Sequence, residues 1–95
     1  MTPKLRTVCN NCHFVETGET DVLFSYDTPI LEIKDYKIVR VFEAYNFSPT
    51  TSKHINKFID SFGFIQLNGQ NLFALDNRQR KKLLDEFYKS PKNAR

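Results

Sequence analysis

The sequence has no tryptophan, one methionine, two cysteines and three glycines in 95 residues. The glycines stand at positions 18, 63 and 69, a spacing that matches neither the G-x-G-x-x-G pattern nor a phosphate-binding P-loop. No apolar run approaches the roughly 20 residues that cross a bilayer, and no apolar segment follows the basic N-terminus. We therefore expect no membrane contact, no signal peptide and a cytoplasmic location.

The two cysteines stand together in the stretch CNNCH, residues 9–13. These letters match a haem-attachment site and half of a zinc site. Haem attachment needs export and a second axial ligand. Zinc needs four ligands in a tetrahedral array. The sequence offers Cys9, Cys12, His13 and His54, but it has no second C-x-x-C, and His13 directly follows Cys12, an awkward geometry for sharing one ion. Cys9 and Cys12 point to opposite faces of a continuous strand and meet only if Asn10-Asn11 forms a tight turn. We expect no metal and no cofactor, and interpret both cysteines as reduced thiols in a strand, at least one of them packed in the core.

Other residue patterns typical of enzymes are also missing from the sequence. No serine or cysteine has a recognisable base partner, and the acidic residues Glu16, Glu19 and Asp21 fit a solvated loop. His54 borders the apolar stripe of a predicted helix, where histidines are more often structural than catalytic. The sequence therefore predicts a protein that is not an enzyme.

Positive charge is concentrated in the second half of the chain. Residues 51–95 hold nine Lys or Arg against four acidic residues, whereas residues 1–50 hold five against seven. This asymmetry indicates an acidic partner such as nucleic acid. The 40% hydrophobic and 14% aromatic content predicts a folded chain, and its length predicts one domain over residues 1–95.

The first half, residues 1–48, is expected to consist mainly of strands. Runs of β-branched and aromatic residues lie at 5–15, 21–26, 30–33 and 38–42. A polar turn joins the last two runs, which predicts a hairpin.

The second half, residues 49–95, begins with a predicted helix. The stretch Ser48-Pro49-Thr50-Thr51-Ser52 offers several N-cap candidates, of which Thr50, Thr51 or Ser52 is expected to cap the helix. Gly63 follows the end of the helix, where a left-handed residue is favoured. The apolar stripe of this helix falls at i, i+3, i+4 and i+7. It comprises Ile55, Phe58, Ile59 and Phe62.

The remaining sequence predicts a hairpin and a second helix. Asn68-Gly69 lies between two apolar runs, which is a strong hairpin signal. Asp76 and Gln79 match a capping box before a helix over 77–89, and residues 90–95 are expected to fray. The fold class is therefore α+β, with a mainly antiparallel sheet of four or more strands packed with two helices in the order β-β-β-β-α-β-β-α. The expected core comprises Val22, Phe24, Ile33, Val39, Val41, Ile55, Phe58, Ile59, Phe62, Leu83, Leu84 and Phe87.

Exposed polar residues on the two predicted helices form the candidate binding surface. Basic helix faces can contact the phosphates of DNA or RNA. The candidate nucleic-acid-binding residues are Ser52, Lys53, Asn56, Lys57, Arg78 and Lys82. The alternative interpretation is a solvated helix face with i, i+4 ion pairs such as Lys81–Asp85.

Aromatic residues in the predicted sheet support a second class of partner. Tyr26, Tyr36, Phe42, Tyr45 and Phe47 would belong in part to the core and in part to an exposed surface. Such a surface would serve a protein-binding module that inhibits or redirects a host factor, or a structural subunit that associates with itself.

Three stretches together resemble a family of small proteins of unknown function encoded by bacteriophages and other mobile elements. They are DVLFSYDTPI at 21–30, EIKDYKIVRV at 32–41 and TTSKHINKFI at 50–59. The shared pattern is VLFSYxTP followed by TTSKHIN, and the resemblance covers about residues 20 to 62. It implies a phage or mobile-element origin and a location in the cytoplasm of a bacterial host. It implies no established activity.

Overall fold

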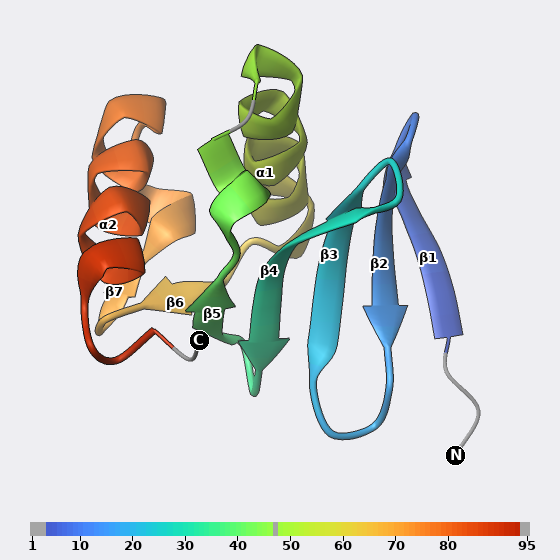
Figure 1. The fold of residues 1–95 in the computed structure, drawn as a ribbon, viewed down its shortest axis with the longest axis horizontal. Coiled ribbons are helices and arrows are strands. Elements are labelled where there is room, and N and C mark those ends of the chain that lie inside the picture. The colour runs from blue at the N-terminus through green and yellow to red at the C-terminus, as the bar shows by residue number, and fades with distance from the viewer. Residues whose placement is uncertain (1–3, 47, 94–95) are drawn as a thin grey trace.

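The computed structural model describes residues 4–46 and 48–93, which form an α+β fold with one seven-stranded, mostly antiparallel sheet and two α-helices (Figure 1). The sheet has the strand order β1-β2-β3-β4-β5-β6-β7, in which β5 and β6 form the parallel pair. The fold class and the order of elements expected from the sequence are confirmed. The elements are β1 (Lys4–Cys9), β2 (Cys12–Glu16), β3 (Asp21–Ser25), β4 (Thr28–Lys34), β5 (Lys37–Val41), η1 (Glu43–Asn46), α1 (Pro49–Phe62), β6 (Gln66–Leu67), β7 (Gln70–Asn71), η2 (Leu72–Ala74) and α2 (Asn77–Lys89).

The first predicted strand, residues 5–15, folds back on itself as the β1–β2 hairpin. Asn10-Asn11 forms the turn, and Asn11 adopts a left-handed conformation with φ of 61°, which Asn tolerates better than most residues. Cys9 and Cys12 are therefore opposite each other across the hairpin rather than on opposite faces of one strand.

The inner face of β3 differs from the expected one. Leu23 and Ser25 are buried, whereas Val22 and Phe24 lie half-buried on the other face. Both faces of this strand carry large apolar residues, so alternation alone could not select the inner one. The pairing of Leu23 with Phe14 and Leu31, both buried, fixes the choice.

A bulge in β5 explains a second difference in the core. Glu32 pairs with Arg40 but Ile33 pairs with Ile38, so Val39 has no opposite residue and is half-buried instead of buried. Phe62 and Leu83 are also partly buried, at the margin of the core. The other expected core residues are buried: Ile33, Val41, Ile55, Phe58, Ile59, Leu84 and Phe87.

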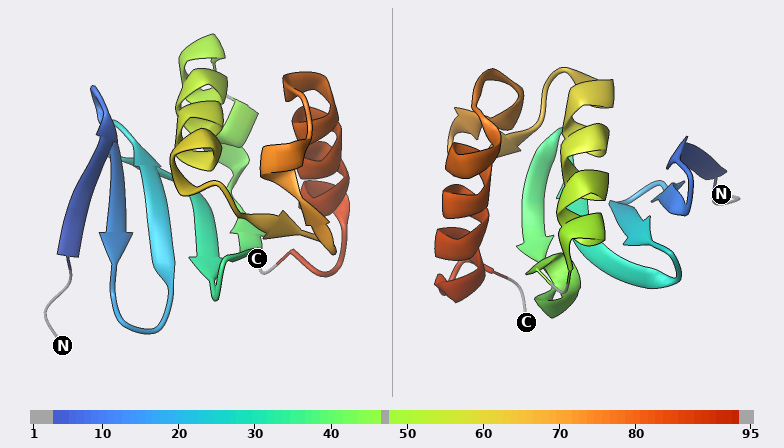
Figure 2. Two further views of the ribbon diagram at one scale, coloured as in Figure 1. Left: turned by 180° about the vertical axis from the view of Figure 1, so that it is seen from behind. Right: turned by 90° about the horizontal axis from the view of Figure 1, so that it is seen from above.

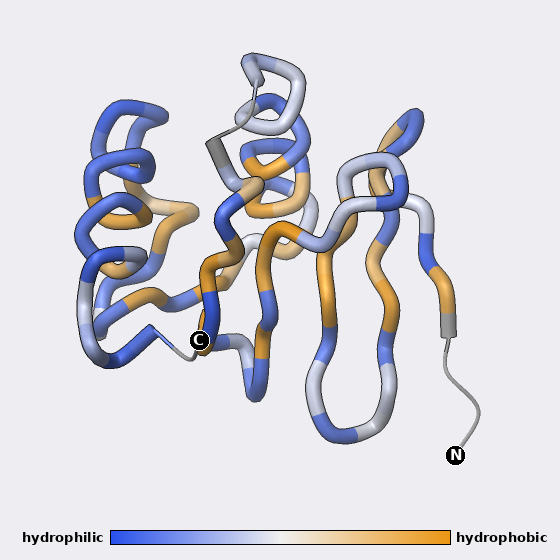
Figure 3. The backbone as a smooth tube through the Cα atoms, viewed as in Figure 1, coloured by the Kyte–Doolittle hydropathy of each residue, from blue (hydrophilic) through white to orange (hydrophobic). Residues whose placement is uncertain are grey.

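Helix α1 lies between the strands β1–β3 and helix α2 (Figure 2). Its apolar face packs on the sheet through aromatic contacts, with the ring of Phe14 5.3 Å from that of Phe58 and 5.0 Å from that of Phe62. Hydrophobic residues follow the strands and the inner side of α1, whereas α2 is largely hydrophilic (Figure 3). Among the residues that the structure describes, no helix is long and apolar enough to cross a membrane.

The helix ends follow from local sequence signals. The N-cap of α1 is Ser48, whose hydroxyl accepts from the amide of Thr51, so the expected cap at Thr50, Thr51 or Ser52 is wrong. Pro49 explains the shift, because proline favours the first helical position. Gly63 ends the helix with φ of 73°, as expected.

The signals of the second half are also confirmed. Asn68 and Gly69 both have positive φ and form the two-residue β6–β7 turn. Asp76 and Gln79 form both hydrogen bonds of a capping box at the start of α2.

The segment after α2 is anchored rather than frayed up to residue 93. The side chain of Asn93 is buried, accepts from the amide of Val41 at 2.8 Å and donates to the carbonyl of Val41 at 3.0 Å. These bonds satisfy backbone groups at the end of β5 that would otherwise lack a partner. The expected fraying therefore does not describe residues 90–93, and residues 94–95 lie outside the described range.

Replacing Asn93 with Ala should destabilise the protein by about 2 kcal/mol, because two buried backbone groups of Val41 lose their hydrogen bonds. The matched control is Lys92→Ala, an exposed change next to it, which should stay within about 0.5 kcal/mol. Urea unfolding of the three proteins measures both effects. Equal stability of Asn93→Ala and the parent protein would contradict the anchoring role.

Candidate nucleic-acid interface

A groove of about 400 Å³ lies between α1 and α2. The two helices run in the same direction, so that both N-termini lie at one end of the molecule (Figures 1 and 2). The apolar floor of the groove is formed by buried side chains, and its rim is polar and basic. Its lining comprises Tyr45, Ser52, Ile55, Asn56, Asn77, Arg78, Arg80, Lys81 and Leu84.

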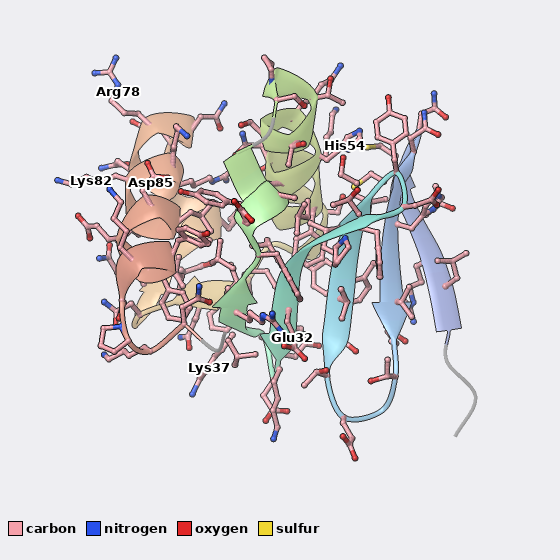
Figure 4. All side chains as sticks on the ribbon, viewed as in Figure 1. Glu32, Lys37, His54, Arg78, Lys82 and Asp85 are labelled. Carbon is pink, nitrogen blue, oxygen red and sulfur yellow. The ribbon has the colours of Figure 1, made fainter. Side chains whose placement is uncertain are left out.

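The structure brings together three of the six predicted binding residues in this groove, namely Ser52, Asn56 and Arg78. Lys53 and Lys57 are exposed on the outward side of α1, one turn apart. Arg78 also lines a shallower cavity of about 330 Å³ along the outer face of α2, together with Lys82 (Figure 4). Arg78 therefore connects the groove with the basic outer face of α2.

Arg80 is a buried residue that lines the groove and is not among the six binding residues predicted from the sequence. It is 5% exposed, and its Nε donates to the carbonyl of Leu72 at 2.8 Å. Its Nη1 donates to Asn56 Oδ1 at 3.0 Å, and its Nη2 pairs with Asp60 Oδ1 at 2.9 Å. The helical spacing from Arg80 to Leu84 and Phe87 is i, i+4 and i+7, a signal that assigns Arg80 to the inner face. Asn56 thus has a structural role in addition to lining the groove.

This clamp, formed by Arg80 with Leu72, Asn56 and Asp60, also determines how charge is distributed around the groove. Arg80 is buried and paired with Asp60, so its charge is largely neutralised within the fold. Arg78 and Lys82 remain exposed on the same helix and face solvent (Figure 4). A charge count made from the sequence alone includes both Arg78 and Arg80, so it overestimates the positive charge on the surface of α2.

The wall of the groove opposite Arg80 is held by a second polar contact. The hydroxyl of Tyr45 donates to Asp85 Oδ1. Burial of the ring, followed by the effect of the Asp85 carboxylate, raises the pKa of Tyr45 well above its ordinary value. Asp85 also forms the expected i, i+4 ion pair with Lys81 at 4.0 Å. Asp85 therefore partly offsets the positive charge that Arg78, Arg80, Lys81 and Lys82 place in the N-terminal half of α2.

The charge pattern at the helix starts favours an anion. Neither α1 nor α2 has an acidic residue in its first turn, although the N-cap of α2 is the carboxylate Asp76. Arg78 stands at the second position of α2. The N-terminal end of a helix carries partial positive charge, so a cation there costs roughly 0.3–1 kcal/mol. Lys81 and Lys82 follow Arg78 before any further acidic residue. A negative charge near Arg78 would reduce this repulsion.

His54 lies on the strand side of α1, away from the groove (Figure 4). Its ring forms a hydrogen bond with the backbone of Asn10, and its Nδ1 shares a hydrogen bond with the hydroxyl of Ser25, 2.8 Å away. No serine was expected to have a base partner, and this pair corrects that expectation. Both side chains are buried, and the contact ties α1 to β3 and to the β1–β2 turn. The sequence carries no local signal for it, because residues 25 and 54 meet only in the fold.

Metal-ligand residues do not gather near these sites. Within residues 4–46 and 48–93, no three side chains of His, Cys, Asp or Glu lie close enough to hold a metal ion. Cys9 and Cys12 are free thiols.

A protein-family model described as "Family of unknown function (DUF8033)" matches residues 2–74. The chain belongs to this family. The match contains all seven strands, α1 and η2, and it ends before α2. Members of a family of unknown function bring no assigned activity to the groove. No curated protein and no solved structure matches this chain.

Replacing Arg80 with Met should destabilise the protein by about 2–4 kcal/mol, because the buried carbonyl of Leu72 and the side chain of Asn56 lose charged hydrogen-bond donors. The matched control is Arg78→Met, which removes an exposed cation two residues away. It should leave stability unchanged or raise it by up to about 1 kcal/mol, since it removes a cation from the helix start. Chemical denaturation distinguishes the two variants, and equal losses would contradict the clamp assigned to Arg80.

Stability should fall as the pH drops below about 6.5. Burial, and to a lesser degree the charge of Lys53, lower the pKa of His54 below its ordinary value of 6.5, although its bond to Asn10 opposes them. The unfolded chain therefore binds the proton more readily, so the stabilisation is complete above the unfolded pKa and is lost as the pH falls through the folded one. Urea unfolding between about pH 5.5 and 7.5 should show a steeper fall in the parent protein than in His54→Gln. Equal slopes would contradict the assignment.

Proposed function

We propose that this protein is a non-enzymatic accessory protein of a bacteriophage or mobile element that binds DNA or RNA in the host cytoplasm. The observation that carries the proposal is the end of the molecule where α1 and α2 begin. There, two helix N-termini point the same way, Arg78 stands in the first turn of α2, and Lys53 directly follows the first turn of α1. Neither first turn holds an acidic residue, and the nearby carboxylate of Asp76 is the N-cap of α2. The family resemblance of the TTSKHIN stretch supports the mobile-element origin.

The proposed contacts are to phosphate rather than to base edges. Lys53 and Lys57 are exposed lysines, which act as mobile point charges and carry little sequence preference. Arg78 stands at the mouth of the groove, where Ser52 and Asn77 add a hydroxyl and an amide. A backbone phosphate near Arg78 would contact these groups while neighbouring phosphates meet the lysines of α1 and Lys82. The expected affinity is modest and strongly dependent on salt.

An exposed aromatic cluster favours a protein partner as the second candidate. Tyr36 and Phe64 are 58% and 46% exposed, their rings are 6.3 Å apart, and Tyr36 also contacts Phe62. Tyr36 has φ of 63°, a strained conformation for a bulky residue, and such strain is often found at functional positions. This cluster would serve a module that inhibits or redirects a host factor, or a subunit that associates with itself.

The other aromatic residues considered for this role are placed less favourably. Tyr45 is buried and Phe42 is half-buried beneath Arg40, whose guanidinium lies 4.2 Å from its ring centroid. Tyr26 is exposed but lies in the β3–β4 turn, where its ring contacts that of His54. Phe47 lies outside the described residues. The exposed cluster is therefore Tyr36 with Phe64, and the partly buried Phe62 contacts Tyr36.

Replacing Lys53 and Lys57 together with Ala should weaken binding to every nucleic-acid sequence by a similar factor, because phosphate contacts do not read sequence. The log–log salt slope should decrease by about 0.7–0.9 for each phosphate that the variant no longer neutralises. The matched control is Lys34→Ala with Lys37→Ala, which removes the same charge from the β4–β5 turn at the opposite end of the molecule (Figure 4). Mobility-shift assays at two salt concentrations, with single- and double-stranded DNA and RNA, measure both effects.

Equal weakening by the two double variants would show that binding follows net charge rather than this surface. Absence of binding to all four nucleic acids at low salt would reject the nucleic-acid function. In that case, the protein-binding function would be supported if the protein captures a host protein even after nuclease treatment. The double variant Tyr36→Ser with Phe64→Ser should then no longer capture that host protein.

A further inference from the structure

The β1–β2 hairpin places the two cysteines in a geometry suited to a disulfide. Cys9 and Cys12 are direct partners across the turn formed by Asn10-Asn11. The register shifts between Thr7 and Cys9, and this bulge turns Cys9 toward the same inner face as Cys12. Directly opposite residues in antiparallel strands have Cα atoms about 4.5–5.5 Å apart. Disulfides form over Cα separations of roughly 4.4–6.8 Å, so the hairpin can close the bond without moving its backbone far.

The two thiols have different surroundings. Cys9 is half-buried near the end of β1, whereas Cys12 is fully buried and its Sγ lies 3.8 Å from the carbonyl oxygen of His54. Burial, followed by the charge of Cys9 and a hydrogen bond with it, raises the pKa of Cys12 to about 12. A reagent from solvent therefore reaches Cys9 first, and Cys12 is the thiol that reacts second.

We propose that Cys9 and Cys12 form a dithiol modification site that a low-molecular-weight disulfide, such as oxidised glutathione, converts to an intramolecular disulfide. The Cys9 thiolate attacks one sulfur of the small disulfide, so that a mixed disulfide forms and one small thiolate leaves. The sulfur of Cys12 then attacks Cys9 Sγ, loses its proton to water and expels the second small thiolate. The two cysteines lose two electrons and two protons, and the small disulfide is reduced to two thiols.

The basicity of Cys12 determines how this site behaves. A thiol of high pKa is a poor leaving group, so small thiols should reopen the Cys9–Cys12 bond slowly once it has formed. The second step of closure is slow for the same reason, because little Cys12 thiolate exists near neutral pH. The disulfide should therefore form slowly and, once formed, be reduced slowly. It does not depend on the nucleic-acid function.

Oxidation of the two cysteines would change the hydrogen bonds between the β1–β2 turn and α1. The thiol of Cys12 donates to the carbonyl of His54, and the backbone of Asn10 in the same turn forms a hydrogen bond with the His54 ring. Closing the disulfide removes the first hydrogen bond and stiffens the turn that makes the second. The site thus adjoins the segment of α1 that carries Lys53 and Lys57.

The test is to incubate the folded protein with excess oxidised glutathione, quench with acid, then unfold it, alkylate free thiols and measure the intact mass. The expected product is a monomer with no alkylated cysteine and no glutathione adduct. Cys12→Ser should stop at the mixed disulfide and carry one glutathione on Cys9. Cys9→Ser should react far more slowly, because its remaining thiol is buried. Folding of each variant is checked by circular dichroism.

A parent protein in which both cysteines remain alkylatable after this treatment would overturn the proposal. A product with glutathione on both cysteines, or a disulfide-linked dimer, would also overturn it, because each shows that the thiols do not meet within the chain. If a serine variant fails to fold, the parent protein in urea replaces it as the comparison. Closure should then be favoured in the folded protein over the unfolded one, and equal closure in both would contradict the role of the hairpin.

Discussion

The guanidinium of Arg80 is the interaction on which the arrangement of the two helices depends. Helix α2 packs mainly on β5 and β6, whereas α1 packs mainly on η1 and β1. Arg80 spans the space between them, because one planar group reaches the carbonyl of Leu72 and the side chains of Asn56 and Asp60. Five fixed donors suit this role better than an ammonium would. The groove exists because the helices are joined by this polar clamp instead of by close apolar packing.

Short-range signals in the sequence predicted much of the fold, because turns and helix ends depend on interactions between residues close together in the chain. Gly63, Asn68-Gly69 and the Asp76–Gln79 capping box require particular backbone conformations or adjacent partners, and each was found where the sequence indicated. The inner faces of the strands were less predictable. Bulges near Val39 and in the β1–β2 hairpin shift the alternation by one residue, and a sequence period of two contains no sign of such a shift.

The candidate site was predictable to the extent that it lies on helix faces. Ser52 and Asn56 fall on one side of α1 by spacing alone, and the structure places both in the groove. Their proximity to Arg78 depends on how α2 packs, which no local pattern specifies. The pairing of Ser25 with His54, and of Cys12 with the carbonyl of His54, has the same origin. Contacts between residues far apart in the chain arise from the tertiary fold, so sequence patterns within one element do not contain them.

One turn of α1 shows how a short stretch can serve several purposes at once. Within residues 52–56, Ile55 packs in the core and His54 bonds to the strands. Asn56 meets the Arg80 clamp while Lys53 faces solvent. Successive side chains of a helix point about 100° apart, so consecutive residues meet different neighbours. The side chains of this turn therefore meet four different surroundings: the core, the strands, the Arg80 clamp and solvent. For this reason, few substitutions in the turn leave both the fold and the proposed surface intact.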